Sequence, residues 1–217
     1  MEIIVINSQK GGSGKTMLAK HLSVEAARDG SPVYLIDTDP QGTLSTWHKR
    51  RESETPALVD LPLDRLERGL ELLRAKGAAY VFIDTASGRL EIAEQLFKLA
   101  DFVLFPIQDS DDDLSAAPVT IQNIKKCGTP FLFVLTRVKP NTLITAQAVA
   151  VLSKHGQVAD VFIRDRTGYK ARYEKGQTVT EAAPRGTAAV EVSLLWQDIR
   201  AELDEETTPN TEEKAHA

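Results

Sequence analysis

The sequence predicts an α/β protein in which a mostly parallel, twisted sheet carries helices on both faces. Short apolar runs, typical of buried parallel strands, occupy residues 3–6, 33–36, 80–83, 102–107 and 131–135. Segments with helical spacing separate these runs, and this alternation is typical of a parallel sheet. With 217 residues, the chain is long enough for one such domain with a sizeable core. We therefore expect one domain over residues 1–203 and a tail over 204–217.

Composition excludes several classes of protein. The chain is 42% hydrophobic and 26% charged, and no apolar run approaches the roughly 18 residues of a membrane span. The N-terminus enters a strand directly, without the basic and apolar regions of a signal peptide. The single cysteine, Cys127, argues against a disulfide framework and against a cysteine-ligated iron–sulfur cluster. A net charge of −5 implies that any nucleic-acid site is a local basic patch.

The first strand leads through a glycine-rich loop into a helix expected over residues 16–28. Residues 3–16 read IIVINSQKGGSGKT. Glycines let a backbone curl so that its N–H groups point at phosphate oxygens, and the helix N-terminus adds its positive dipole end. In such a loop Lys15 reaches the β- and γ-phosphates and the Thr16 hydroxyl ligates Mg²⁺. The residues expected to bind ATP are Gly11, Gly12, Ser13, Gly14, Lys15 and Thr16.

The strand at residues 33–36 ends in Asp37-Thr-Asp39-Pro-Gln. Ligand-binding groups collect at the carboxyl ends of strands in open parallel sheets. Two carboxylates one residue apart at such an end suit the handling of a metal ion and of water. Asp and Pro also form ordinary turns, which is the alternative interpretation of this stretch.

Residues 43–77 are predicted to be scaffold. We expect a short helix over 43–51, a short strand over 57–59 and a helix over 64–76 that stops at Gly77. The basic and aromatic run Trp47–Arg51 is either a solvated helix end or a surface for DNA or a partner.

The strand at residues 80–83 is followed by Asp84, and four apolar residues before an Asp form the Walker B pattern. Such a strand places the carboxylate opposite the phosphate loop, where it holds Mg²⁺, usually through a water. We therefore predict that Asp84, with Thr16, serves the metal.

The second half of the predicted domain continues the alternation. Helices are expected over 88–99, 114–126 and 143–155, between strands at 102–107 and 131–135 and a late strand at 161–163. The acids of residues 109–113 precede a helix, so N-cap and dipole roles explain them, or they contact a dimer partner or the nucleotide.

Basic side chains and tyrosines alternate over residues 164–175. Clustered Lys and Arg meet phosphates, which makes binding independent of sequence and sensitive to salt. The candidate DNA contacts are Arg164, Arg166, Lys170 and Arg172, and an ordinary solvated helix face is the alternative. A last helix is expected over 188–203, and the acidic, polar tail 204–217 is predicted to be disordered.

Three motifs in this order resemble the deviant Walker A ATPases of the ParA/MinD family, and most closely the small ParA-type (ParF-like) partition ATPases. They are the loop with both Lys10 and Lys15, the Asp37–Gln41 stretch and the strand that ends in Asp84. The chain departs from the common Walker A loop at Gln9, where a glycine is usual, and from relatives at Asp109, where a proline is usual.

The resemblance implies several roles. Lys10 would reach across a dimer to the partner's nucleotide, Asp39 would position the attacking water, and Asp37 would support the Mg²⁺ shell. Arg137 would stack on adenine, unless it is a surface ion-pair residue, and Asp113 best matches the acidic residue of its loop. MinD-like relatives anchor to membrane through a basic C-terminal helix, and residues 204–217 supply none.

We therefore expect a slow ATPase that forms an ATP-sandwich homodimer on Mg²⁺-ATP and binds DNA without sequence preference. A ParB-like adaptor would stimulate hydrolysis and release it, in the partition of plasmid or chromosome DNA. The protein would be cytoplasmic, nucleoid-associated and free of membrane. A positioning ATPase for a protein cargo, such as a microcompartment or a receptor cluster, uses the same motifs. A small-molecule kinase or ligase of this fold is the third alternative.

Overall fold

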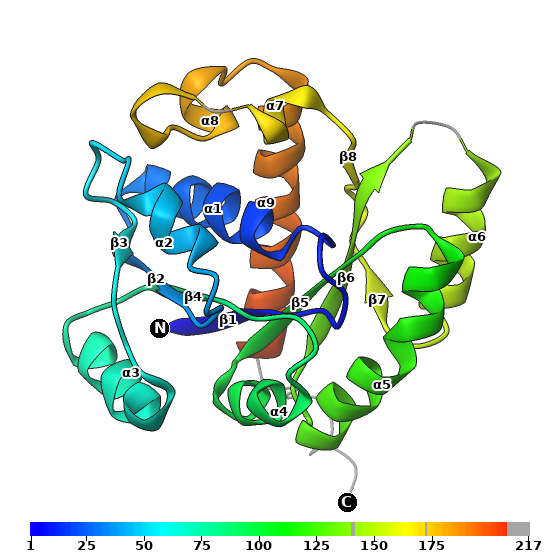
Figure 1. Cartoon of the computed structure of the whole chain (residues 1–217), viewed down its shortest axis with the longest axis horizontal. Coiled ribbons are helices and arrows are strands. Elements are labelled where there is room, and N and C mark those ends of the chain that lie inside the picture. Colours follow the sequence, from blue (N-terminus) through cyan, green and yellow to red (C-terminus); the bar gives the residue numbers. More distant parts are fainter. Residues whose placement is uncertain (140–141, 172, 208–217) are drawn as a thin grey trace, which may run out of the picture.

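The computed structural model describes residues 1–139, 142–171 and 173–207 (Figure 1). A parallel sheet of strand order β3-β2-β4-β1-β5-β6-β7 forms the centre, and β8 pairs with β6. The strands are β1 (Glu2–Ile6), β2 (Val33–Asp37), β3 (Ala57–Leu58), β4 (Tyr80–Asp84), β5 (Phe102–Ile107), β6 (Phe131–Val138), β7 (Gln157–Val158) and β8 (Ile163–Arg164). This arrangement confirms the predicted α/β class.

In the described part of the chain, the first six helices lie between strands, and the last three follow the final strand. They are α1 (Lys15–Ala26), α2 (Thr43–His48), α3 (Leu66–Ala75), α4 (Leu90–Leu99), α5 (Asp111–Cys127), α6 (Leu143–Leu152), α7 (Thr167–Lys170), α8 (Val179–Ala182) and α9 (Thr187–Thr207), with 3₁₀ turns η1 (Ala27–Asp29), η2 (Leu63–Arg65) and η3 (Glu174–Gly176).

Two hydrophobic cores sandwich the sheet, because successive strand residues face opposite sides. In β1, Ile4 and Ile6 belong to the core under α1, α2 and α9, whereas Ile3 and Val5 belong to the core under α3 to α6. The two sets of helices lie on opposite sides of the sheet in Figure 1. On the α9 face, Trp196 packs edge-on against Tyr80 with ring centroids 5.0 Å apart.

The order in which the strands join the sheet changes direction at β1. The chain builds β2 to β4 on one side of β1 and then crosses to β5, β6 and β7 on the other. Loops at the carboxyl ends therefore diverge on either side of β1, and this switch point is where parallel sheets bind ligands.

Several elements differ from the predictions. Helix α5 begins at Asp111 and not at residue 114, because the Ser110 hydroxyl caps it by accepting from the Asp113 N–H and the acids favour the first turn. Strand β7 pairs with β6 and was not predicted, since its two residues carry no pattern. Helix α9 continues to Thr207, past the predicted start of the tail at residue 204. The rest of that tail, 208–217, lies outside the described residues.

No helix in the described part of the chain combines the length and the apolar character that a bilayer crossing needs.

Candidate nucleotide-binding site

The glycine-rich loop lies at the carboxyl end of β1, the strand between β4 and β5. Gly12 and Gly14 have φ angles of 79° and 104°, in the left-handed region that residues with a Cβ rarely adopt. A Cβ on Gly14 would also lie 3.3 Å from Met17 and 3.4 Å from Thr136. Gly14 supplies no side-chain cap to α1, so the amide groups of the first helical turn remain available to an anion.

Side chains from β6 and the end of β5 hold the loop in place. The Thr136 hydroxyl donates to the Ser13 carbonyl at 2.7 Å, and the Gln108 amide donates to the Gly12 carbonyl at 3.2 Å. Inside the loop, the Ser8 and Ser13 hydroxyls are 2.5 Å apart. The loop is therefore organised by the protein itself, which is what electrostatic stabilisation of phosphate charge requires.

Lys15 is buried between two loops. Its ammonium donates to the Lys10 carbonyl at 3.2 Å and to the Ser87 hydroxyl at 2.5 Å. Burial lowers the pKa of Lys15, while the carboxylates of Asp84 and Asp39 act in the opposite direction. The ammonium thus lies between the glycine-rich loop and the loop after β4, where a nucleotide's terminal phosphates would meet it.

The Thr16 hydroxyl donates to Asp84 Oδ2 at 2.6 Å, which joins the two residues predicted to serve Mg²⁺. Asp84 is fully buried, and burial raises its pKa to about 7 in spite of the Thr16 hydrogen bond. Its Oδ1 has no hydrogen-bond partner among the described residues. An oxygen donor left unpartnered beside a hydroxyl fits a hard cation such as Mg²⁺.

Mg²⁺ characteristically binds through one or two protein oxygens, several waters and the phosphates of the substrate. Thr16 and Asp84 would therefore hold the ion together with a nucleotide. The metal would neutralise phosphate charge during hydrolysis.

The two carboxylates after β2 have different surroundings. Asp37 Oδ2 accepts from the Ser45 N–H at 2.8 Å and from the Ser45 hydroxyl at 2.9 Å, so this oxygen already anchors α2. Asp37 is also the neighbour of Asp84 across β2 and β4 and raises its pKa. Asp39 is half-buried and accepts from the Gln41 N–H at 3.0 Å. The metal role of Asp37 and the water-positioning role of Asp39 stay predictions.

The Lys10 side chain extends toward the start of α5. Its ammonium is 3.8 Å from Asp112 and 3.7 Å from Asp113, and 39% of its side chain is exposed. Asp113 also accepts from the Ser110 hydroxyl at 2.8 Å. Ion pairs this long contribute little stability, so the contact holds Lys10 only weakly, and its role toward a dimer partner stays a prediction.

Arg137 lines a cleft of about 680 Å³ together with Gln108, Asp109, Lys139 and Ile144. Its guanidinium lies 3.9 Å from the position that a Cβ on Gly12 would take, so the cleft adjoins the phosphate loop. The volume is within the range of small-molecule sites, roughly 300–1,000 Å³. The cleft has room for a nucleoside, and stacking of Arg137 on adenine stays a prediction.

The described basic side chains that were predicted to contact DNA face carboxylates of the same chain, so less positive charge is available to DNA than the sequence indicates. Arg166 is bound to Glu191 at 2.6 Å, Lys170 to Asp165 at 2.5 Å, and Arg164 lies 4.0 Å from Glu191. Arg172 lies outside the described residues. Glu191 belongs to α9, and no pattern in the sequence indicates that α9 packs on this segment.

Sequence reasoning did not assign roles to Ser87, Gln108 and Asn7. The Asn7 amide donates to the Thr85 hydroxyl at 2.8 Å, which ties the loop after β1 to the loop after β4. A polar residue close after a buried strand was the available signal, because Asn7 and Gln108 directly follow β1 and β5 and Ser87 lies three residues after β4.

The chain is similar in sequence and in fold to known nucleotide-binding proteins. The profile of the CobQ/CobB/MinD/ParA nucleotide-binding domain matches residues 4–179. "Maintenance of carboxysome distribution protein A" of Gloeobacter kilaueensis is 31% identical over 93% of this chain and 94% of its own, and that of Halothiobacillus neapolitanus is 28% identical over 90% and 95%. The chromosome partitioning protein ParA of Caulobacter vibrioides is 30% identical over 50% of this chain and 56% of its own. The fold resembles MinD of Pyrococcus horikoshii complexed with Mg-ADP, with a TM-score of 0.74, 17% identity and coverage of 94% and 98%.

Proposed function

The chain belongs to the CobQ/CobB/MinD/ParA family and is an ATPase of the ParA/MinD type, and on that premise we propose that it positions a protein assembly inside the cell. The observation that carries this proposal is the extent of the matches. Both carboxysome-distribution relatives align over nine-tenths or more of both chains, whereas the Caulobacter ParA aligns over about half.

Hydrolysis would follow from the charges around the loop. The Lys15 ammonium and the loop amides would bind the β- and γ-phosphates and stabilise the charge that develops on the transferred phosphoryl group. Asp39, half-buried at the end of β2, would orient the attacking water. Thr16 and Asp84 would hold Mg²⁺ through their paired oxygens.

ATP would act as a switch by promoting formation of a homodimer. Lys10 would leave the acids of α5 and contact the partner's nucleotide, so that ATP binds the dimer better than the monomer and shifts the equilibrium toward it. The ATP-bound dimer would bind nucleoid DNA without sequence preference, and an adaptor on the cargo would stimulate hydrolysis and release it.

Partition of plasmid or chromosome DNA is the second candidate, because two ParA relatives match 57% and 50% of the chain. The two functions differ in what the adaptor holds. A protein cargo leaves the ATPase without any preferred DNA locus, whereas a partition adaptor bound to a centromere-like site concentrates it there.

Chromatin immunoprecipitation of the Asp39→Ala variant in its own cells separates them. Loss of the water-positioning carboxylate is expected to trap the ATP-bound form. Even coverage of the genome and of all plasmids would support protein cargo. A sharp peak at one locus would contradict protein cargo and favour partition.

A further inference from the structure

A small recess lies away from the nucleotide cleft, between α1, the end of α2 and residues 168–171 and 173–178. Lys20, Arg50, Tyr173, Gln177 and Thr178 contribute to its lining, and its volume is about 40 Å³. One water needs about 10–15 Å³ by the same measure, so the recess has room for about three waters, close to the size of one phosphate group.

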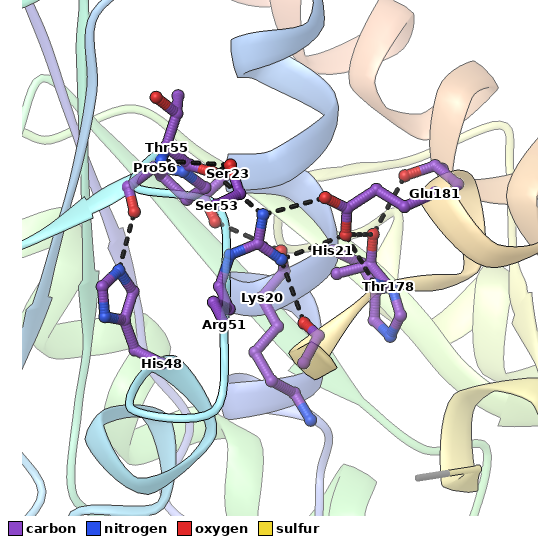
Figure 2. Close-up of polar contacts among 12 residues, drawn as sticks. Lys20, His21, Ser23, His48, Arg51, Ser53, Thr55, Pro56, Thr178 and Glu181 are labelled. Atoms are coloured by element: carbon purple, nitrogen blue, oxygen red, sulfur yellow. Dashed lines mark hydrogen bonds and ion pairs between the residues drawn. The ribbon is translucent and has the colours of Figure 1, made fainter. Parts of the chain in front are cut away.

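Arg51 is not one of the lining residues, but it binds the backbone of Gly176, which is (Figure 2). Its buried guanidinium binds both carboxylate oxygens of Glu181, at 2.8 and 3.0 Å, and also donates to the Gly176 carbonyl at 3.0 Å. The same group lies 5.0 Å from the centre of the Trp47 ring. Arg51 therefore ties the stretch from Gly176 to Glu181 to the segment that follows α2, and it pairs with the Glu181 carboxylate.

The backbone around Gly176 is equally constrained. Lys175 and Gly176 both have positive φ angles, 56° and 65°. A Cβ on Gly176 would lie 2.8 Å from the Arg51 backbone nitrogen, so only glycine fits there without a shift. Lys175 itself is paired with Glu52 at 2.9 Å, which adds a second tie between the two segments.

Lys20 and Arg50 bring positive charge to the recess. Among the described residues, neither side chain has a hydrogen-bond or ion-pair partner. Figure 2 shows the Lys20 side chain extending away from the Arg51–Glu181 pair. Burial and the nearby Arg50 lower the pKa of Lys20, and the carboxylate of Asp84 acts in the opposite direction. None of the described residues that line the recess is acidic.

The basic side chains of the recess differ from those of residues 164–170 in how they are paired. There each described basic side chain faces a carboxylate of the same chain, whereas Lys20 and Arg50 form no direct ion pair with any described residue. A half-buried, unpaired ammonium is costly unless an anion binds it.

We propose that the recess binds a phosphate group, with Lys20 and Arg50 as its charged contacts and with Tyr173 and Gln177 as neutral donors. The phosphate would come from the backbone of duplex DNA or from a small phosphorylated solute. The DNA source rests on the proposed function, because it requires that the protein binds DNA.

The first experiment measures binding of a non-specific duplex by fluorescence anisotropy, in saturating ATP over a series of salt concentrations. It compares the wild type with Lys20→Gln and Arg50→Gln. Lys49→Gln is the matched control, because it removes the same charge from an exposed neighbour that does not line the recess. Far-UV circular dichroism and a thermal melt establish that each variant is folded.

If a DNA phosphate occupies the recess, each recess variant binds several-fold more weakly, and its slope of log affinity against log salt falls by about 0.9 for each phosphate that the variant no longer neutralises. The Lys49→Gln slope stays near that of the wild type. Recess variants that match Lys49→Gln would rule out the DNA source while leaving the proposed function intact.

The second experiment titrates inorganic phosphate calorimetrically into protein saturated with a non-hydrolysable ATP analogue, so that the glycine-rich loop is already filled. Binding that disappears in Lys20→Gln and persists in Lys49→Gln supports a small-solute source, even if the wild type fails to bind DNA in every nucleotide state. If neither DNA nor phosphate binding depends on Lys20 and Arg50, the proposal is overturned.

Discussion

Asp84 makes the stability of the metal-free protein depend on pH in a direction unusual for a carboxylate. Its pKa lies at about 7, against an ordinary value of 3.8, chiefly because the side chain is fully buried. The folded state therefore holds the proton more tightly than the unfolded state, and this residue's contribution to stability rises as pH falls from about 7 toward 3.8. Above pH 7 its ionisation costs about 4 kcal/mol of folding free energy.

The test is Asp84→Asn, whose amide oxygen still accepts from the Thr16 hydroxyl but carries no charge. Urea unfolding in EDTA at pH 5 and pH 8 gives the stability of the variant relative to the wild type. The variant should gain about 3 kcal/mol more at pH 8 than at pH 5, because only the wild type must bury a charge at the higher pH. Asp64→Asn, which removes an exposed carboxylate, should show no such difference.

A metal role for Asp84 predicts a second effect of the same substitution. Mg²⁺ should tighten nucleotide binding to the wild type but not to Asp84→Asn, as measured by titration with a fluorescent ATP analogue. A stability difference between variant and wild type that is equal at pH 5 and pH 8 would refute the reasoning about burial.

Three further predictions follow from the geometry. Lys10→Ala should keep ATP binding and lose ATP-dependent dimerisation, and an unchanged dimer by light scattering would refute that role for Lys10. Gly176→Ala should lose about 1–3 kcal/mol of stability in urea unfolding, because its Cβ meets Arg51 at 2.8 Å and its φ is 65°; an unchanged midpoint would contradict the close packing. His21 is buried, accepts from the Val179 N–H, and has a pKa lowered to about 3 from 6.5, so the unfolded state takes up its proton first and stability falls as pH drops below 6.5. Between pH 7 and pH 5 the wild type should lose about 2 kcal/mol more than His21→Gln, and equal losses would show that His21 is not held neutral.

The fold was predictable because its signals are local. The five long strands are continuous apolar runs, and their order fixes most of a parallel sheet once right-handed crossovers are assumed. The sequence pattern missed the two-residue strand β7. It placed β8 and the start of α5 a few residues away from their true positions. In those cases pairing with β6, or a cap from Ser110, decides the structure, and neither leaves a periodic pattern.

The nucleotide site was predictable where chemistry follows sequence spacing, as in the glycine-rich loop and at Asp84. Contacts between distant segments were not predictable. The run Trp47–Arg51 was weighed as a solvated helix end or an exposed binding surface, yet Trp47 is buried and Arg51 joins Glu181 across 130 residues of sequence. Likewise, the neutralisation of Arg166 by Glu191 depends on how α9 packs, which composition and periodicity do not specify.

The central claim is that ATP controls attachment of this protein to DNA. The most direct measurement is co-sedimentation with non-specific duplex DNA in moderate salt, in the presence of ADP and of ATP. The account predicts binding with ATP and none with ADP. Equal binding in both states, or no binding by an ATP-bound dimer, would contradict it.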